Sequence, residues 1–181
     1  LGPLVYFASS GPQRIRVQVR EDGLAIDQIV LSADRYRTVA PGPVKNDATI
    51  LDEALPSTQT EVVLHAKNAA IASGWIVTND VTAAGGARLQ NPNAGAPKIS
   101  TPLASPARDF EMTFNAESGI GYRLWIRGKA ASNGWANDSV YVQFDRSVDQ
   151  AGQPLYRIGT TFATTYTLED CTGCGVSGWG W

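Results

Sequence analysis

Apolar and polar residues alternate with a period of two along many short stretches of this sequence, which is the pattern of a β-strand with one buried face. The clearest stretch, QRIRVQVREDGLAIDQIVLS at residues 13–32, consists of two such patterns on either side of Glu21-Asp22-Gly23. Gly23 tolerates the positive φ of a tight turn, so we expect a β-hairpin. A hairpin this apolar needs further strands to cover it. Together with the short run at residues 4–8, its apolar positions are Leu4, Val5, Phe7, Ile15, Val17, Val19, Ile26, Ile29 and Leu31.

The rest of the chain repeats this pattern in short segments separated by turn residues, and no segment shows the 3.6-residue period of an α-helix. Residues 33–60 lose all periodicity and contain the proline-bearing stretches APGP and LPST, so we interpret them as a linker. Many short strands punctuated by turns predict an all-β sandwich or jelly roll. The further strands are expected at residues 61–66, 75–77, 87–89, 98–99, 110–114, 122–126, 140–144, 156–158 and 164–168.

Several pieces of the sequence carry a resemblance to a known family: TAAGGARL, the strand pair YRLWIRGKA and NDSVYVQFD, the loop EDCTGCGVSGWGW, and the closing REDGLAIDQIVL. Residues 61–181 resemble the first two-thirds of a galactose-binding-like jelly roll, as found in carbohydrate-binding modules of families 6 and 35. Residues 1–32 resemble the last third of the same fold. The closing strands therefore precede the body that they close, as in a circular permutation or in one period of a tandem array cut out of frame.

The reversed order predicts three parts: closing strands at 1–32, the linker at 33–60 and the main body of the jelly roll at 61–181. Each of the two β fragments exposes unpaired strands and needs a partner. The two fragments of one chain would fold onto each other at an entropic cost of roughly a few kcal/mol for closing the linker. Alternatively, residues 1–32 complete a neighbouring identical subunit, and strand exchange that does not close on itself builds a filament. The sequence leaves both arrangements open.

Composition narrows the classes of partner. The chain has 181 residues, 43% of them hydrophobic, and a formal net charge of −2. Such a balance gives no basis for binding nucleic acid. No apolar run approaches the roughly 20 residues that cross a bilayer, so we expect no membrane insertion. The abundance of Gly, Ala, Thr, Ser, Asn and Trp is typical of an extracellular or cell-surface β-protein.

The two cysteines, Cys171 and Cys174, form a lone CxxC in a glycine-rich loop. A zinc site would need two more ligands, and the chain has one histidine, His65. A thioredoxin-like site would need a βαβ context, which the pattern lacks. We therefore expect a local disulfide, which fits an oxidising compartment.

Exposed Trp rings commonly stack on the apolar faces of sugars, while Asn, Asp or Arg side chains bind the hydroxyl groups. Trp135 and Asn137 lie in a polar loop between two expected strands, and Trp179 and Trp181 lie in the GWGW loop. In the resembled modules, loops at one end of the sandwich form the sugar site, so these four residues are the expected ligand contacts. For Trp179 and Trp181 the alternative is packing onto the sandwich or burial in a neighbouring subunit.

The resembled modules often hold a structural Ca²⁺ between a Glu-Ala-Glu-like opening tripeptide and an aspartate of the closing strand. Asp27 stands at that closing position, but the opening tripeptide is His65-Ala66-Lys67, and Lys67 offers no oxygen ligand. The sequence thus gives a structural calcium little support, and we expect no cofactor. A salt bridge from Lys67 to Asp27 would place a cation where the metal would sit.

Residues for catalysis do not stand out. No GxSxG elbow accompanies His65, and no glycine loop precedes a helix. A glycosidase needs two carboxylates across a cleft, but nothing distinguishes the loop carboxylates from solvated charges. These carboxylates are Asp138, Asp145, Glu169 and Asp170.

The sequence therefore predicts a non-catalytic, extracellular carbohydrate-binding-type module rather than an enzyme. Its expected partners are a glycan and identical subunits joined by strand exchange in a repetitive or self-assembling surface protein. The alternative is a purely structural subunit of an extracellular filament that binds no sugar.

Overall fold

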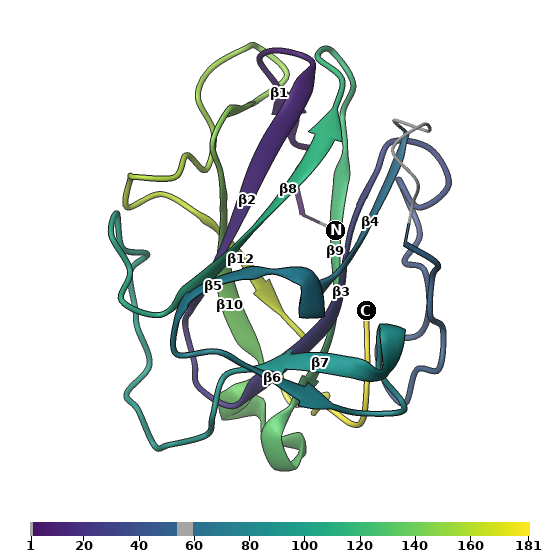
Figure 1. The fold of residues 1–181 in the computed structure, drawn as a ribbon, viewed down its shortest axis with the longest axis vertical. Coiled ribbons are helices and arrows are strands. Elements are labelled where there is room, and N and C mark those ends of the chain that lie inside the picture. The colour runs from purple at the N-terminus through teal and green to yellow at the C-terminus, as the bar shows by residue number, and fades with distance from the viewer. Residues whose placement is uncertain (1, 54–59) are drawn as a thin grey trace.

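The computed structural model describes residues 2–53 and 60–181, so Leu1 and residues 54–59 of the expected linker lie outside it. Within these residues the chain is all-β, as expected, with only single-turn 3₁₀ helices beside its strands (Figure 1). The strands are β1 (Tyr6–Phe7), β2 (Gly11–Val19), β3 (Leu24–Ser32), β4 (Glu61–His65), β5 (Ala70–Ser73), β6 (Ile76–Asn79), β7 (Ala87–Gln90), β8 (Asp109–Ala116), β9 (Arg123–Ala130), β10 (Ser139–Phe144), β11 (Ser147–Val148) and β12 (Thr164–Thr167). The 3₁₀ helices are η1 (Ala66–Asn68), η2 (Ala84–Gly86), η3 (Ala131–Asn133) and η4 (Trp135–Asn137).

The strands form an antiparallel β-sandwich. One five-stranded sheet has the order β12-β10-β2-β8-β5. In the other, β3 pairs with β9 along one edge and with β4 and β7 along the other, and β6 extends the sheet beyond β7. β1 and β11 form a separate two-stranded ribbon.

The second and third strands of the chain, β2 and β3, lie in the interior of the two sheets. β2 lies between β8 and β10, and β3 lies between β9 and the pair β4 and β7 (Figure 1). Residues 11–32 therefore pair with strands that follow the expected linker, and this pairing occurs within one chain. Strand exchange with a second chain stays a prediction.

The predicted hairpin is wrong, although both of its strands exist. β2 and β3 do not pair with each other, because the chain crosses from one sheet to the other at residues 20–23. The reason is burial of the corner: Glu21 and Asp22 are each 5% exposed. Oδ2 of Asp22 accepts hydrogen bonds from the backbone N–H groups of Ala94 and Ala96, both at 2.8 Å. The chain thus forms a buried corner between the two sheets, which contacts with the loop after β7 stabilise, in place of a β-hairpin turn.

The core fills the space between the two sheets. Alternation decides which side chains enter it: Ile15, Val17 and Val19 of β2 are all buried there, as the pattern predicts. At one end the ring of Phe7 meets those of Phe114 and Phe144 edge-on, with centroids 5.5 and 5.8 Å apart. Burial of apolar surface of this kind is the dominant stabilising contribution to such a fold.

β3 is buried on both faces, because the first part of the expected linker covers its outer side. Residues 33–53 contain no strand or helix, as expected, but they pack on the sandwich. The amide of Gln28 donates to the carbonyl of Leu51 at 2.6 Å and its Oε1 accepts from the N–H of Leu51 at 3.1 Å. Trp125 of β9 joins this second layer and donates its Nε1–H to the carbonyl of Tyr36 at 2.6 Å.

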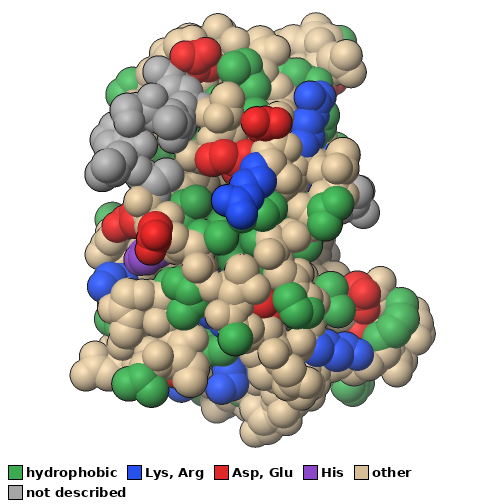
Figure 2. All heavy atoms as spheres, turned by 90° about the vertical axis from the view of Figure 1, so that its right-hand side faces the viewer, with side chains coloured by type: hydrophobic (Ala, Val, Ile, Leu, Met, Phe, Trp, Pro, Cys, Tyr) green, Lys and Arg blue, Asp and Glu red, His purple; other side chains and the backbone are tan. Residues whose placement is uncertain are grey.

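Other expectations differ from the structure in detail. β5 and β11 were not expected, because four exposed residues and a two-residue ribbon leave little pattern. Residues 98–99 form no strand, and residues 156–158 contribute only an isolated bridge to Phe144. On the face seen in Figure 2, hydrophobic side chains are spread among polar ones rather than gathered in one patch.

Candidate functional site

Four loops meet at one end of the sandwich: the corner at 20–23, the loop after β7, the loop of η3 and η4, and the Cys-bearing loop after β12. Asn137 donates from Nδ2 to the carbonyl of Asp22 at 2.7 Å, and Ala131 donates its N–H to the carbonyl of Gly23 at 3.0 Å. The N–H of Gly178 donates to Oδ1 of Asn133 at 3.0 Å. These bonds hold residues 131–137, which we call the Trp135 loop, between its neighbours.

Gly23 makes this close approach feasible. Its φ is +86°, in the region that favours glycine. A Cβ at this position would lie 2.8 Å from Nδ2 of Asn137 and 3.0 Å from Cβ of Ala131. The corner of β2 and β3 therefore packs directly under the Trp135 loop.

Trp135 projects from this loop into solvent, with 68% of its surface exposed. It lines two clefts. The cleft on one side, which we call the disulfide cleft, has a volume of about 610 Å³ and is lined by Trp135, Glu169, Asp170, Cys171, Thr172 and Gly173. The other, which we call the lysine cleft, has a volume of about 490 Å³ and is lined by Glu21, Asp22, Asn93, Gly95, Ala96, Lys98, Trp135, Ala136 and Asn137.

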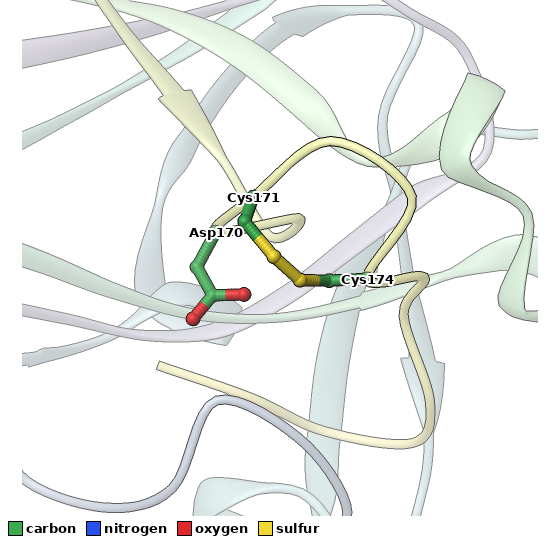
Figure 3. A group of neighbouring side chains, drawn as sticks. All are labelled: Asp170, Cys171 and Cys174. Atoms are coloured by element: carbon green, nitrogen blue, oxygen red, sulfur yellow. A yellow bond between two sulfur atoms is a disulfide. The ribbon is translucent and has the colours of Figure 1, made fainter.

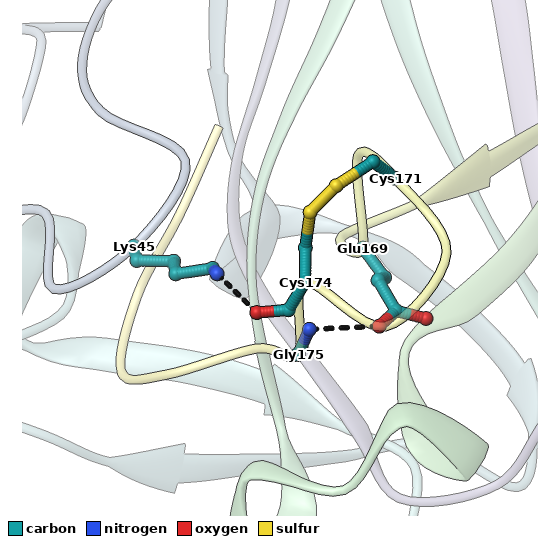
Figure 4. Close-up of a disulfide and its surroundings, with 5 residues drawn as sticks. All are labelled: Lys45, Glu169, Cys171, Cys174 and Gly175. Carbon is teal, nitrogen blue, oxygen red and sulfur yellow. Dashed lines mark hydrogen bonds between the residues drawn. A yellow bond between two sulfur atoms is a disulfide. The ribbon is translucent and has the colours of Figure 1, made fainter.

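The wall of the disulfide cleft is fixed covalently. Cys171 and Cys174 form a disulfide, as expected, and Asp170 lies beside it (Figure 3). Nζ of Lys45 donates to the carbonyl of Cys174 at 2.5 Å, and the N–H of Gly175 donates to Oε1 of Glu169 at 2.8 Å (Figure 4). The loop is thereby tied to residues 33–53 as well as to itself.

A zinc site does not fit this loop as it stands. The ligand atoms of Asp170, Cys171 and Cys174 lie within 4.8 Å of one another, which is a spacing that suits a metal. Zinc, however, takes cysteine as thiolate, and both sulfur atoms are bonded to each other here.

The lysine cleft contains buried charges that the protein itself pairs. Nζ of Lys98 lies 2.7 Å from Oε1 of Glu21, and the hydroxyl of Ser139 donates to Oε2 of Glu21. Burial alone would raise the pKa of Glu21, but the hydrogen bonds from Lys98 and Ser139 outweigh it and hold the pKa below its ordinary value. Burial raises the pKa of Asp138, although the N–H of Glu169 and the hydroxyl of Thr167 donate to its carboxylate.

The structure separates the four expected ligand contacts into two groups. Trp135 is exposed and Asn137 is half-buried beside it, with its amide bonded to Asp22. Trp179 and Trp181 are only 4% and 5% exposed. These burials match the packing alternative for both residues, so the ring faces of Trp179 and Trp181 are not offered at the Trp135 loop.

Trp179 and Trp181 instead seal the outer face of the sheet that contains β3. The Trp179 ring lies over the guanidinium of Arg127, 4.9 Å from its centroid, and Nε1 donates to the hydroxyl of Thr82 at 3.0 Å. Trp181 packs against Val30 and Val63. Gly2 and Trp181 line one further cavity of about 480 Å³, so the two ends of the described chain lie near each other.

The expected salt bridge from Lys67 to Asp27 is wrong. Nζ of Lys67 donates to the carbonyl of Gly85 at 2.8 Å, and the cation at Asp27 is Arg127, whose Nη1 lies 2.5 Å from Oδ2. Nε of Arg127 also lies 2.6 Å from Oδ2 of Asp47. Burial raises the pKa of Asp27 to about 6, although Arg127 and the N–H of Ala84 act against it.

This arrangement does not fit a Ca²⁺ ion. Oδ2 of Asp27 is already held by Arg127 and by the N–H of Ala84, and the guanidinium places a positive charge where the ion would sit. Lys67 adds a second cation nearby, bonded at Gly85 next to Ala84. The residues thus disfavour the structural calcium of the resembled modules.

Sequence reasoning missed two parts of this end of the molecule. Glu21 and Asp22 were expected only as part of a tight turn, but both are buried next to the Trp135 loop. Arg127 was expected only as a residue of the YRLWIRGKA strand, but it is fully buried between Asp27 and Asp47. The position of Asp27 on the closing strand was the one signal that marked the region.

Comparison with protein-family models, with curated proteins and with solved structures gives no match. Among residues 2–53 and 60–181, no helix is both long and apolar enough to cross a membrane.

Proposed function

We propose that this protein is a non-catalytic, extracellular carbohydrate-binding module of the galactose-binding-like type, with a ligand-binding surface centred on Trp135. The observation that carries the proposal is one exposed Trp ring, set between two clefts on a loop that hydrogen bonds tie to its neighbours. Sugar-binding sites combine a flat aromatic ring with polar side chains, because the ring stacks on the pyranose and the polar groups bind its hydroxyls. Cleft volumes of about 610 and 490 Å³ suit one or two sugar rings.

Several further observations support the same proposal. The chain is an all-β sandwich, and the Trp135 loop lies at one of its ends, which is where the resembled modules carry their sugar site. The disulfide between Cys171 and Cys174 is typical of an oxidising, extracytoplasmic compartment. The buried carboxylates of Glu21 and Asp138 are bonded to Ser139 and Thr167, so they support loops rather than face a substrate.

The test is a glycan array followed by titration calorimetry of the best ligand, with Trp135→Ala and Phe162→Ala as variants. Phe162 is a matched control, because it is also an exposed aromatic residue but lines neither cleft. We expect Trp135→Ala to weaken binding about 30-fold, since loss of a central aromatic contact costs about 2 kcal/mol, and Phe162→Ala to bind normally. Absence of binding to every glycan, or normal binding by Trp135→Ala, would overturn the proposal.

A further inference from the structure

The disulfide cleft and the lysine cleft differ in the charge that they offer a ligand. In the lysine cleft, Glu21 is paired with Lys98 and Asp22 accepts two backbone N–H groups, so its carboxylates are already engaged. The titratable side chains that line the disulfide cleft are two carboxylates, Glu169 and Asp170, and no lysine or arginine is among its lining residues.

Those two carboxylates keep free acceptor oxygens. Asp170 is exposed and forms no hydrogen bond or ion pair among the described residues. Glu169 uses Oε1 to hold the N–H of Gly175, and among the described residues no hydrogen bond uses its Oε2. Lys45, a cation that contacts this loop, donates to the carbonyl of Cys174 (Figure 4).

The third wall of the cleft is the Trp135 ring. An aromatic face attracts a cation as well as an apolar sugar face, and this attraction adds to that of nearby carboxylates. A sugar bearing an ammonium group satisfies all three walls at once: its ring stacks, and its charge meets Asp170 and Glu169. A uronic acid would instead bring a carboxylate against two others, which is repulsive.

We propose that the disulfide cleft selects oligosaccharides of amino sugars with a free, protonated amine, such as glucosamine oligomers, over their N-acetylated and uronic acid counterparts. This inference rests on the proposed function and specifies its ligand class. The chemistry is non-covalent, so N-acetylation, which removes the charge but keeps the ring, is the discriminating change.

The experiment titrates the whole chain, at mildly acidic pH and low salt, with short oligomers of glucosamine, N-acetylglucosamine and galacturonic acid. We expect glucosamine oligomers to bind most tightly and their binding to weaken as salt is added. Asp170→Asn should weaken that binding about fivefold, the effect of losing one exposed ion pair. Asp52→Asn is the matched control, because Asp52 is also exposed and unbonded among the described residues but lies outside the cleft.

The outcomes separate the two proposals. Equal or tighter binding of the N-acetylated or galacturonic acid oligomers, or no effect of Asp170→Asn, overturns the amino-sugar inference. The proposed function still stands in that case if a neutral glycan binds and Trp135→Ala weakens its binding. Tight Trp135-dependent binding of a lysine-rich peptide in place of the oligomers also overturns it, because the cation would then be a peptide's. Circular dichroism of each variant confirms that the fold is intact.

Discussion

Arg127 is the residue on which the outer layer of the molecule depends. It lies fully buried between Asp27 and Asp47, with the Trp179 ring over its guanidinium. Removing a charge from water costs several kcal/mol unless partners and hydrogen bonds replace the solvent. Here two carboxylates, the carbonyl of Asp47 and an aromatic face replace it, so residues 33–53 and the GWGW loop are fastened to β9 by one side chain.

The raised pKa of Asp27 makes a prediction about acid stability. Because the folded-state pKa of about 6 lies above the ordinary value of 3.8, folded Asp27 takes up a proton more readily than unfolded Asp27. Its contribution to stability is therefore fully present below about pH 4 and is lost as pH rises through 6. We expect the free energy of unfolding of the wild type, minus that of Asp27→Asn, to fall by on the order of 2 kcal/mol between pH 4 and pH 7. Urea denaturation at a series of pH values measures this difference.

Taking this difference is what isolates Asp27. The pKa values of Glu21 and Asp80 are lowered, so their contributions to the stability of the protein are lost as pH falls. Both residues are present in the wild type and in the variant, so these contributions cancel in the difference. A difference that stayed constant with pH would contradict the raised pKa of Asp27. A difference that rose between pH 4 and pH 7 would show instead that the attraction of Arg127 outweighs burial and lowers this pKa.

At the scale of elements, the corner between β2 and β3 is what connects the sandwich to the candidate site. Its backbone at Gly23 touches Asn137 and Ala131 of the Trp135 loop, and Asp22 holds the loop after β7. A change in the corner should therefore reach Trp135 without any contact to a ligand.

Gly23→Ala tests this link, with Gly11→Ala as its control. Both glycines have positive φ, +86° and +108°, but a Cβ at Gly11 would meet nothing within 4 Å. We expect Gly11→Ala to destabilise by about 1 kcal/mol through backbone strain alone, and Gly23→Ala by about 2–3 kcal/mol. Glycan affinity should drop only in Gly23→Ala, and an equal loss of stability in the two variants would argue against the contact.

How far the sequence predicts these elements follows from what a period of two encodes. It identifies the core-facing residues of β2, β8 and β10, and those strands are where alternation placed them, although every residue of β10 is buried. It does not encode which strand lies beside which, so the β2–β3 hairpin was the natural but wrong choice. The burial of both faces of β3 depends on residues 33–53, whose irregular pattern gives no sign that they form a layer.

The candidate site was predictable to a similar extent. The loop position of Trp135 between two strands made exposure a reasonable expectation, and the structure shows it. Trp179 and Trp181 have equally polar, glycine-rich neighbours, yet they are buried, because Arg127, Val30 and Val63 lie beneath them. Those partners are distant in sequence, so local composition could not distinguish the three rings.

At the scale of the whole molecule, the order of the chain and the order of the strands in space are separate matters. Each of β2 and β3 has partners on both sides within its own chain, so exchange between chains would require both sheets to open. The cavity that Gly2 and Trp181 both line brings the described ends together. A short linker could therefore join the two described ends without moving the strands.

A circular permutant tests that closure. Joining Trp181 to the N-terminal segment with a short Gly-Ser linker and opening the chain between Glu53 and Thr60 restores the strand order of the resembled modules. We expect a folded protein with a denaturation midpoint close to that of the original, because loop-closure entropy changes slowly with length. Opening between Arg16 and Val17 instead should prevent folding, since it cuts the strand between β8 and β10. If the second permutant folded, or if the first failed to fold, the inference that the two ends can be joined within the sandwich would be wrong.

The irregularity at Asp27 has a consequence of its own. In the pairing of β3 with β9, Ile26 lies opposite Gly128 and Gln28 opposite Arg127, so Asp27 is an extra residue, a bulge, in an otherwise regular ladder. A chain without it would keep Ile26 pointing inward and Gln28 outward. Inserting or deleting this one residue therefore adds or removes the carboxylate that contacts the guanidinium of Arg127. The neighbouring side chains of β3 keep their faces of the sheet, so the change leaves the strand register intact.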